Sequence, residues 1–291
     1  MDFLALCAQA MNGLIAFWQW IVSAAVTVWA AVVNFFIAIG VKAVQIWFNF
    51  LATMLSFPNK WNVFWDRFGG VDGAWRRVLG EGLTNTLIIA FLGLLIGIVL
   101  GTLIASIKVM PKYKWLPRVL DKLCTVYVGF FRGTPIVVQL LLTYFVLFPM
   151  LGLRVSSLNT CILVFGLNSA AYCSEIMRGG ILSVDPGQME GGRAVGLSYF
   201  TTMMKIVVPQ AIKNILPTLG NELIALVKDT SVVSFVAAVD LAKTFTEIGN
   251  KTYEYMIPYL MMALIYIVLV ALITVGIKIM ERSLRKSDRR N

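Results

Sequence analysis

After residue 80, four long stretches of the sequence carry no charged residue, and they limit the possible fold more than any other feature. They cover residues 83–107, 133–153, 155–174 and 255–277. Each is near or above the length of about 18 residues that indicates a transmembrane helix. A fifth, weaker stretch at about 206–227 contains Lys213, Glu222 and two prolines. Such residues persist at membrane depth where they face a protein interior or a wet cavity. The sequence therefore predicts an all-α membrane protein with a core of five spans.

Composition excludes several other classes. The chain is 59% hydrophobic and 14% charged, whereas a soluble domain is about 45–50% apolar and roughly a quarter charged. It has no histidine, which removes the commonest general base and the most frequent metal ligand. Its four cysteines form no CxxC pair, so a zinc site is not indicated. We therefore expect no enzyme, no metal and no cofactor.

The net charge of +10 predicts an orientation. Residues 108–122 and the tail 282–291 each hold five Lys or Arg against one Asp. The positive-inside rule puts both in the cytoplasm, so the charge does not call for a nucleic-acid partner. With five spans, the segment 178–205 then falls inside and the segment 228–254 falls outside. The C-terminus is predicted to be cytoplasmic.

Residues 1–57 form a hydrophobic extension. Residues 3–41 are uncharged, a run too long for a signal peptide. A narrow polar stripe recurs at a helical period. One helix along this stripe, which runs from Gln9 to Ser56, would reach about 70 Å, against a bilayer core of about 30 Å. We expect it to bend, to lie partly in the interface, or to fold back near Gly40, with two membrane helices preferred. Residues 58–82 are predicted to be an extracytoplasmic or interfacial linker.

The first core span carries a stripe of small residues, Gly93, Gly97, Gly101 and Ala105, at intervals of four. Small residues on one stripe let helix backbones approach closely in lipid. We interpret the stripe as a helix-packing surface and assign it no substrate role.

The stretch between the third and fourth spans, residues 171–210, is rich in glycine, and a helical pattern resumes at about 188–206. A short amphipathic helix on the cytoplasmic side suits docking into a groove on a soluble partner. The residue pattern alone is equally compatible with a helix that lies in the membrane interface.

This stretch resembles a known signature. Glu190-Gly-Gly-Arg-Ala-Val-Gly196, followed by Ile206-Val-Val-Pro209, is similar to the EAA motif of polar amino acid permease subunits of bacterial ATP-binding-cassette importers. Gly191 and Gly192 replace the two alanines of that motif, and Val208 replaces its usual leucine. Each glycine should weaken the start of the helix by about 1 kcal/mol relative to alanine.

Three further elements resemble the same family, in the expected order over residues 82–281. Arg132-Gly-Thr-Pro135 with Gln139 is similar to an element of its second core span. Ala171-Tyr172 with Glu175, Arg178-Gly-Gly180 and Gly187-Gln188 is similar to the run before the EAA motif. Asn221-Glu222 with Lys228-Asp-Thr-Ser231 is similar to the end of its fourth core span.

The resemblance implies a type I importer permease of a bacterial plasma membrane, with residues 83–281 as its core. It implies pairing with a second permease chain, identical or different, two copies of an ABC ATPase subunit on the cytoplasmic side, and an extracytoplasmic amino-acid-binding protein. The chain has no GxxxxGK[ST] phosphate-binding loop, which is consistent with a separate ATPase. The resemblance also implies ATPase-coupling residues in the segment 178–205 and just beyond it: Glu190, Gly191, Gly192, Arg193, Gly196, Tyr199 and Pro209.

The candidate substrate-binding residues lie at membrane depth. Glu222 and Asp229 are seven apart, which places them on one helix face two turns apart. Two such acids could hold the cationic group of an amino acid, and Arg132 suits its carboxylate. Thr134 is a further candidate beside Arg132, and Gln139 is a weaker one. Alternatively, Asp229 pairs with Lys228 or caps a turn, and Arg132 snorkels. The acid pair favours a basic amino acid such as arginine, lysine or histidine.

Two other functions fit the residue pattern. An ion-coupled secondary amino acid transporter would use an intramembrane acid such as Glu222 without ATP. A non-transporting membrane scaffold could be built on the same core. ATP-dependent uptake by a reconstituted complex would distinguish the importer from both.

Overall fold

The computed structural model describes residues 3–69 and 73–288, and these are helical with no strand among them. The chain forms two compact units, Met1–Trp61 and Asn62–Asn291. Helix α1 (Phe3–Gly69) runs through the first unit, and its last turns belong to the second.

The extension lies in a single helix, α1, of 67 residues, which also takes in residues 58–69 of the predicted linker, where the sequence predicts two shorter helices for the extension. Gly40 does not end it, because one glycine costs only about 1 kcal/mol in a helix interior. Its large apolar side chains are exposed from Trp20 to Leu55. The hydroxyls of Ser23, Thr27 and Thr53 bond to the helix's own carbonyls. The polar stripe therefore needs no neighbouring helix for its hydroxyls, and how the extension meets the bilayer stays a prediction.

The second unit is a helical bundle. Its α-helices after α1 are α2 (Trp75–Arg77), α3 (Thr84–Val109), α4 (Trp115–Gly133), α5 (Ile136–Leu142), α6 (Phe148–Met150), α7 (Ser157–Leu182), α8 (Pro186–Ala194), α9 (Tyr199–Thr202), α10 (Val208–Asp229), α11 (Leu241–Thr252) and α12 (Met256–Asp288). Three π-helical segments, η1 (Val78–Leu83), η2 (Thr143–Leu147) and η3 (Met203–Val207), and one 3₁₀ helix, η4 (Thr230–Val236), join them. The predicted linker 58–82 is thus largely helical.

Within the described residues, four helical stretches are long and apolar enough to cross a membrane: Gln19–Gly69, Trp75–Val109, Ser157–Leu182 and Met256–Leu284. A fifth is Trp115–Gly133 with Ile136–Met150, a pair bent by 103°. Helix α10, the weak fourth core span, is not among them, because it carries Lys213, Glu222, Lys228 and Asp229. It nevertheless packs against α7, α12 and α3, so protein surrounds it on several sides.

The small-residue stripe of α3 packs against α7, which confirms the predicted packing surface. Gly93, Gly97 and Gly101 are all buried. A Cβ on Gly101 would lie 2.7 Å from the Cβ of Cys173, and one on Gly97 would lie 2.6 Å from the Oγ of Ser169. Only glycine allows these backbones to approach so closely.

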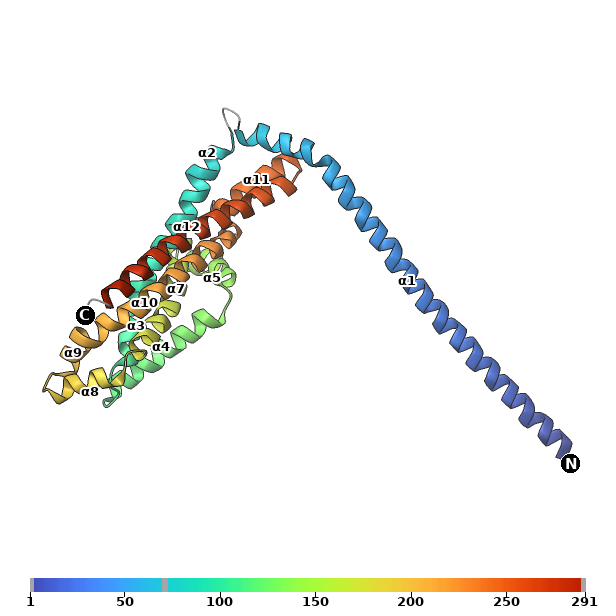
Figure 1. The fold of residues 1–291 in the computed structure, drawn as a ribbon, viewed down its shortest axis with the longest axis horizontal. Helices are drawn as coiled ribbons and strands as arrows, with labels where there is room; N and C mark the ends of the chain where they lie inside the picture. Colours follow the sequence, from blue (N-terminus) through green and yellow to red (C-terminus); the bar gives the residue numbers. More distant parts are fainter. Residues whose placement is uncertain (1–2, 70–72, 289–291) are drawn as a thin grey trace. The chain divides into compact units, whose positions relative to one another are not determined.

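The bundle has two distinct ends. Helices α8 and α9 lie at one end, and α2 and α11 lie at the other (Figure 1). The charge pattern of the sequence predicts that the α8–α9 end is cytoplasmic.

Candidate functional site

The helix break between α4 and α5 organises one side of the candidate substrate site. Pro135 has no N–H, and it follows Gly133 and Thr134, where the chain bends. Carbonyls freed by such a break must find donors, since lipid offers none. The amide of Gln139, 5% exposed, donates to the carbonyls of Phe131 and Thr134 at 3.0 and 3.1 Å. It also donates to the Thr134 hydroxyl at 2.9 Å.

Gln139 and Thr134 are therefore occupied with the bend itself. Asn168 of α7 completes the arrangement, because its amide donates to the Phe131 carbonyl and to Gln139 Oε1, both at 3.1 Å. These contacts hold the break in one shape, and they fix the turn of helix that presents Arg132.

Arg132 is exposed, and its guanidinium lies over the ring of Tyr172, 5.2 Å from the ring centre. This cation–π contact orients the side chain and uses none of its five donors. Within residues 3–69 and 73–288, no hydrogen bond or ion pair holds those donors. They can therefore donate to a carboxylate.

Glu222 is partly buried on α10, and the hydroxyl of Ser169 donates to its Oε1 at 3.0 Å. Asp229 is the last residue of the same helix and is exposed. Its side chain makes no capping bond to η4. The two acids thus share one helix, as the spacing predicts, with the first in the bundle and the second at its margin.

Helix α7 contacts both the acid and the base. Ser169, which contacts Glu222, and Tyr172, which contacts Arg132, are three residues apart and so are neighbours on the helix surface. Sequence reasoning did not select Asn168, Ser169 or Tyr172 as site residues. Their signal is that each is a polar group within an otherwise uncharged span.

The cytoplasmic segment has well-defined helix ends. Asp185 caps α8 by accepting from Gly187 N at 2.7 Å. At the other end, Leu197 N donates to Gly192 O and Gly196 N donates to Arg193 O, both at 3.1 Å. This pair of bonds is a Schellman motif, which requires a left-handed residue. Gly196 fills that place, with φ of +88°.

The two glycines of the EAA-like motif differ in their surroundings. A Cβ on Gly191 would meet nothing within 4 Å, whereas one on Gly192 would lie 2.5 Å from Cγ2 of Thr202. Gly192 therefore lets α8 pack closely on α9. Gln210, next to Pro209 at the start of α10, donates to Gln188 Oε1 of α8 at 3.1 Å.

The outer surface of this segment carries unpartnered apolar side chains. Val195 is 77% exposed and Phe200 is 72% exposed. Glu190 and Arg193 are exposed beside them. Tyr199 is partly buried, and burial raises the pKa of its phenol, so it stays neutral. The segment combines a rigid turn with an apolar and charged face.

An ion-pair cluster ties α3 to α7 near this end. Lys108 Nζ lies 2.6 Å from Glu175 Oε1, and Arg178 lies 2.8 Å from Glu175 Oε2. In the described part of the chain, no group of three or more His, Cys, Asp or Glu side chains could hold a metal ion.

Comparisons with known proteins agree on one class. The family profile described as binding-protein-dependent transport system inner membrane component matches residues 97–286. The arginine transport system permease protein ArtQ of Bacillus subtilis is 37% identical over 210 residues, covering 72% of this chain and 93% of that protein. The putative glutamine transport system permease protein GlnP of Rickettsia bellii is 37% identical over 204 residues, covering 70% and 91%.

Solved structures give the same picture. An amino acid ABC transporter crystallised with histidines has a chain that is 35% identical, with a TM-score of 0.66, covering 72% of this chain and 95% of that one. The MetNI methionine ABC transporter has a chain of the same fold, with a TM-score of 0.59 at 20% identity, covering 70% and 94%. The family profile begins at residue 97, beyond the extension.

Proposed function

The chain belongs to the family of binding-protein-dependent transport system inner membrane components, and we propose that the amino acid it carries is a basic one. It is a multi-pass inner-membrane permease subunit of an amino acid ABC importer and not itself an enzyme. Such a permease works with an ATPase and a substrate-binding protein. The proposal concerns its cargo, its site residues and the way its partners attach.

The cargo proposal rests on Glu222. Relatives of equal identity have names that specify arginine in one case and glutamine in another, so overall similarity does not select between them. Glu222 is a partly buried acid with one hydrogen bond, from Ser169. A carboxylate in such a place gains from a cationic partner. Tyr172, one helical turn along α7 from Ser169, holds Arg132. Arg132 would bind the carboxylate of the same amino acid whose cationic group contacts Glu222.

Asp229 would act at the margin of the path and attract the cationic cargo. Thr134 and Gln139 would contribute indirectly, by holding the bend that presents Arg132. The path itself would lie between this chain and a second permease chain, either identical or different.

Of the two ATPase copies, one would attach at the α8–α9 segment of this chain and the other at the second permease chain, on the cytoplasmic side with the C-terminus. Glu190, Arg193, Val195 and Phe200 supply the contact face, and the rigid turn at Gly196 transmits the movement. Closure of the ATPase dimer would then switch the spans between outward and inward access.

Glu222→Gln tests the cargo proposal. The complex is reconstituted in proteoliposomes with its binding protein, and uptake of arginine and lysine is measured. We expect uptake to fall at least about tenfold, because losing one charge-assisted contact costs about 1.5–3 kcal/mol. Glu281→Gln, an acid near the far end of α12, serves as the control. Unchanged uptake of arginine and lysine in Glu222→Gln would contradict the proposal.

Gly196→Trp tests the coupling proposal. A non-glycine residue at φ of +88° is strained, and the indole adds bulk to the ATPase contact face. We expect both uptake and binding-protein-stimulated ATP hydrolysis to be abolished. Ser283→Trp adds the same bulk to an exposed site on α12 and should leave both rates intact. If Gly196→Trp keeps normal uptake and normal stimulation, the assignment is wrong.

A further inference from the structure

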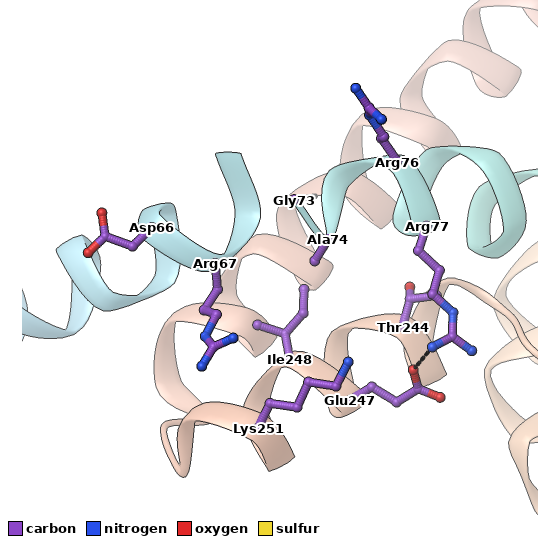
Figure 2. A pocket seen from close by; sticks show the side chains of 10 residues that line it. All are labelled: Asp66, Arg67, Gly73, Ala74, Arg76, Arg77, Thr244, Glu247, Ile248 and Lys251. Atoms are coloured by element: carbon purple, nitrogen blue, oxygen red, sulfur yellow. Dashed lines mark hydrogen bonds and ion pairs between the residues drawn. The ribbon is translucent and has the colours of Figure 1, made fainter. Parts of the chain in front are cut away.

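A pocket of about 500 Å³ lies at the end of the bundle opposite α8 and α9. It is formed by the last turns of α1, by α2 and by α11, as Figure 2 shows. Its floor is made of the buried residues Gly73, Thr244 and Ile248. The last turns of α1 are anchored beside it, since Phe64 is 1% exposed and Phe68 stacks on Phe245 with ring centres 6.4 Å apart. The pocket is therefore a built cavity within one compact unit.

The charge of the lining is positive. Four basic residues against two acidic ones give a net charge of +2; they are Arg67, Arg76, Arg77 and Lys251 against Asp66 and Glu247. Arg77 is neutralised, because it lies 2.6 Å from Glu247 and 3.1 Å from Glu81. The excess therefore falls on the other basic side chains.

Arg67 and Lys251 are the two bases that can take a ligand. Their side chains point into the space between the end of α1 and α11, whereas Arg76 points away from it (Figure 2). Neither Arg67 nor Lys251 has an ion-pair partner within residues 3–69 and 73–288. Two unpaired cations that face one cavity favour an anion between them.

The surroundings of the pocket match the interfacial region of a bilayer. Trp65 and Trp75 flank it in the sequence, 38% and 39% exposed, and tryptophans gather at membrane–water interfaces. The α1 turns that form one wall continue a long apolar helix. Helix α11, the other wall, leads directly into the span α12.

We propose that this pocket binds the phosphate of an anionic phospholipid headgroup. Basic pockets beside membrane helices bind such headgroups, and the flanking tryptophans place the cavity at headgroup depth. The lipid would join the last turns of α1 to α11. The inference requires only that the chain lies in a bilayer, so it stands or falls independently of cargo and of ATP coupling.

The test uses the full-length permease in detergent with equal amounts of phosphatidylglycerol and phosphatidylcholine of matched chains. Native mass spectrometry counts the lipids that the protein retains. Wild type should prefer phosphatidylglycerol, and Arg67→Gln with Lys251→Gln should bind it about thirtyfold more weakly, corresponding to about 1 kcal/mol per charge removed. Arg154→Gln, an exposed arginine predicted on the same side, should behave as wild type. Arg67→Lys with Lys251→Arg keeps both charges and should keep the lipid.

Three results would overturn the proposal. The first is equal retention of phosphatidylglycerol by wild type and by the double glutamine variant, with both shown to be folded by their melting curves. The second is displacement of the lipid by millimolar inorganic phosphate, which would make the site one for small anions. The third is unchanged lipid retention with weakened affinity for the substrate-binding protein, which would make the pocket a protein contact.

Discussion

Asp240 illustrates how one residue combines a stabilising and a destabilising contribution. It is fully buried at the start of α11, where its carboxylate accepts from Ala242 N and Lys243 N, both at 3.0 Å. These bonds satisfy the free donors of the helix start. Burial nevertheless raises the pKa of Asp240, and the opposing bonds to Lys243 and Ala242 do not cancel that effect.

The raised pKa sets the sign of a pH dependence. An acid with a raised folded-state pKa contributes stability below its unfolded pKa of about 3.9, and this contribution is lost as pH rises through the folded pKa. Asp240→Asn keeps an acceptor without the charge. We expect it to be at least as stable as wild type at pH 7.5, whereas Asp240→Ala should lose about 1 kcal/mol with the cap. Melting curves at pH 5.5 and 7.5 measure this. An asparagine variant no more stable than the alanine variant would contradict it.

The sequence predicts the charged residues of the site but not the polar residues that contact them. Glu222 and Arg132 are conspicuous because charges are rare at membrane depth. Ser169 and Tyr172 are ordinary in a span until the fold places them against those charges. The packing of α4 and α10 against α7 decides which polar residues of α7 face the site. This packing cannot be predicted from the sequence alone.

Among the elements, α8 shows why two adjacent glycines have different roles. Gly191 is exposed with open space around it. Gly192 is buried, and a Cβ on it would lie 2.5 Å from Cγ2 of Thr202. The family resemblance alone treats both as equal departures from alanine. The packing of α8 on α9 separates them.

Alanine substitutions make this difference measurable. Gly191→Ala should stabilise α8 by about 1 kcal/mol, which would appear as slower hydrogen exchange across residues 186–202. Gly192→Ala should speed exchange there, because overpacking costs about 1–3 kcal/mol. Adding Thr202→Ser removes the colliding methyl and keeps the hydroxyl bond to Ser198, so it should restore slow exchange. Equal effects of the two alanines would show that Thr202 is not the cause.

Some helices of this chain can be predicted from its sequence, and others cannot. The charge-free runs predicted α3, α7 and α12, because hydrophobic length is a local property. The 103° bend between α4 and α5 was not predicted, although Pro135 marks its place. The bend depends on donors from the nearby Gln139 and from Asn168, which lies 37 residues along the chain from Phe131. The continuous α1 was also not predicted, because a turn at Gly40 was favoured over a helix longer than a bilayer is thick.

For the whole molecule, the central claim is that cargo movement by this permease is driven by ATP bound on another subunit. The core has the family fold, the α8–α9 segment presents exposed Val195 and Phe200, and the sequence has no phosphate-binding loop of its own. Intramembrane acids alone would also fit an ion-coupled carrier. The energy source therefore distinguishes an ATP-driven importer from an ion-coupled carrier.

Uptake of radiolabelled arginine by proteoliposomes tests this claim most directly. They contain the complete complex, with the binding protein outside and ATP or its non-hydrolysable analogue inside, and an ionophore removes every ion gradient. We expect uptake that requires both hydrolysable ATP and the binding protein and that is unaffected by the ionophore. Uptake that follows an imposed proton or sodium gradient and ignores ATP would contradict it.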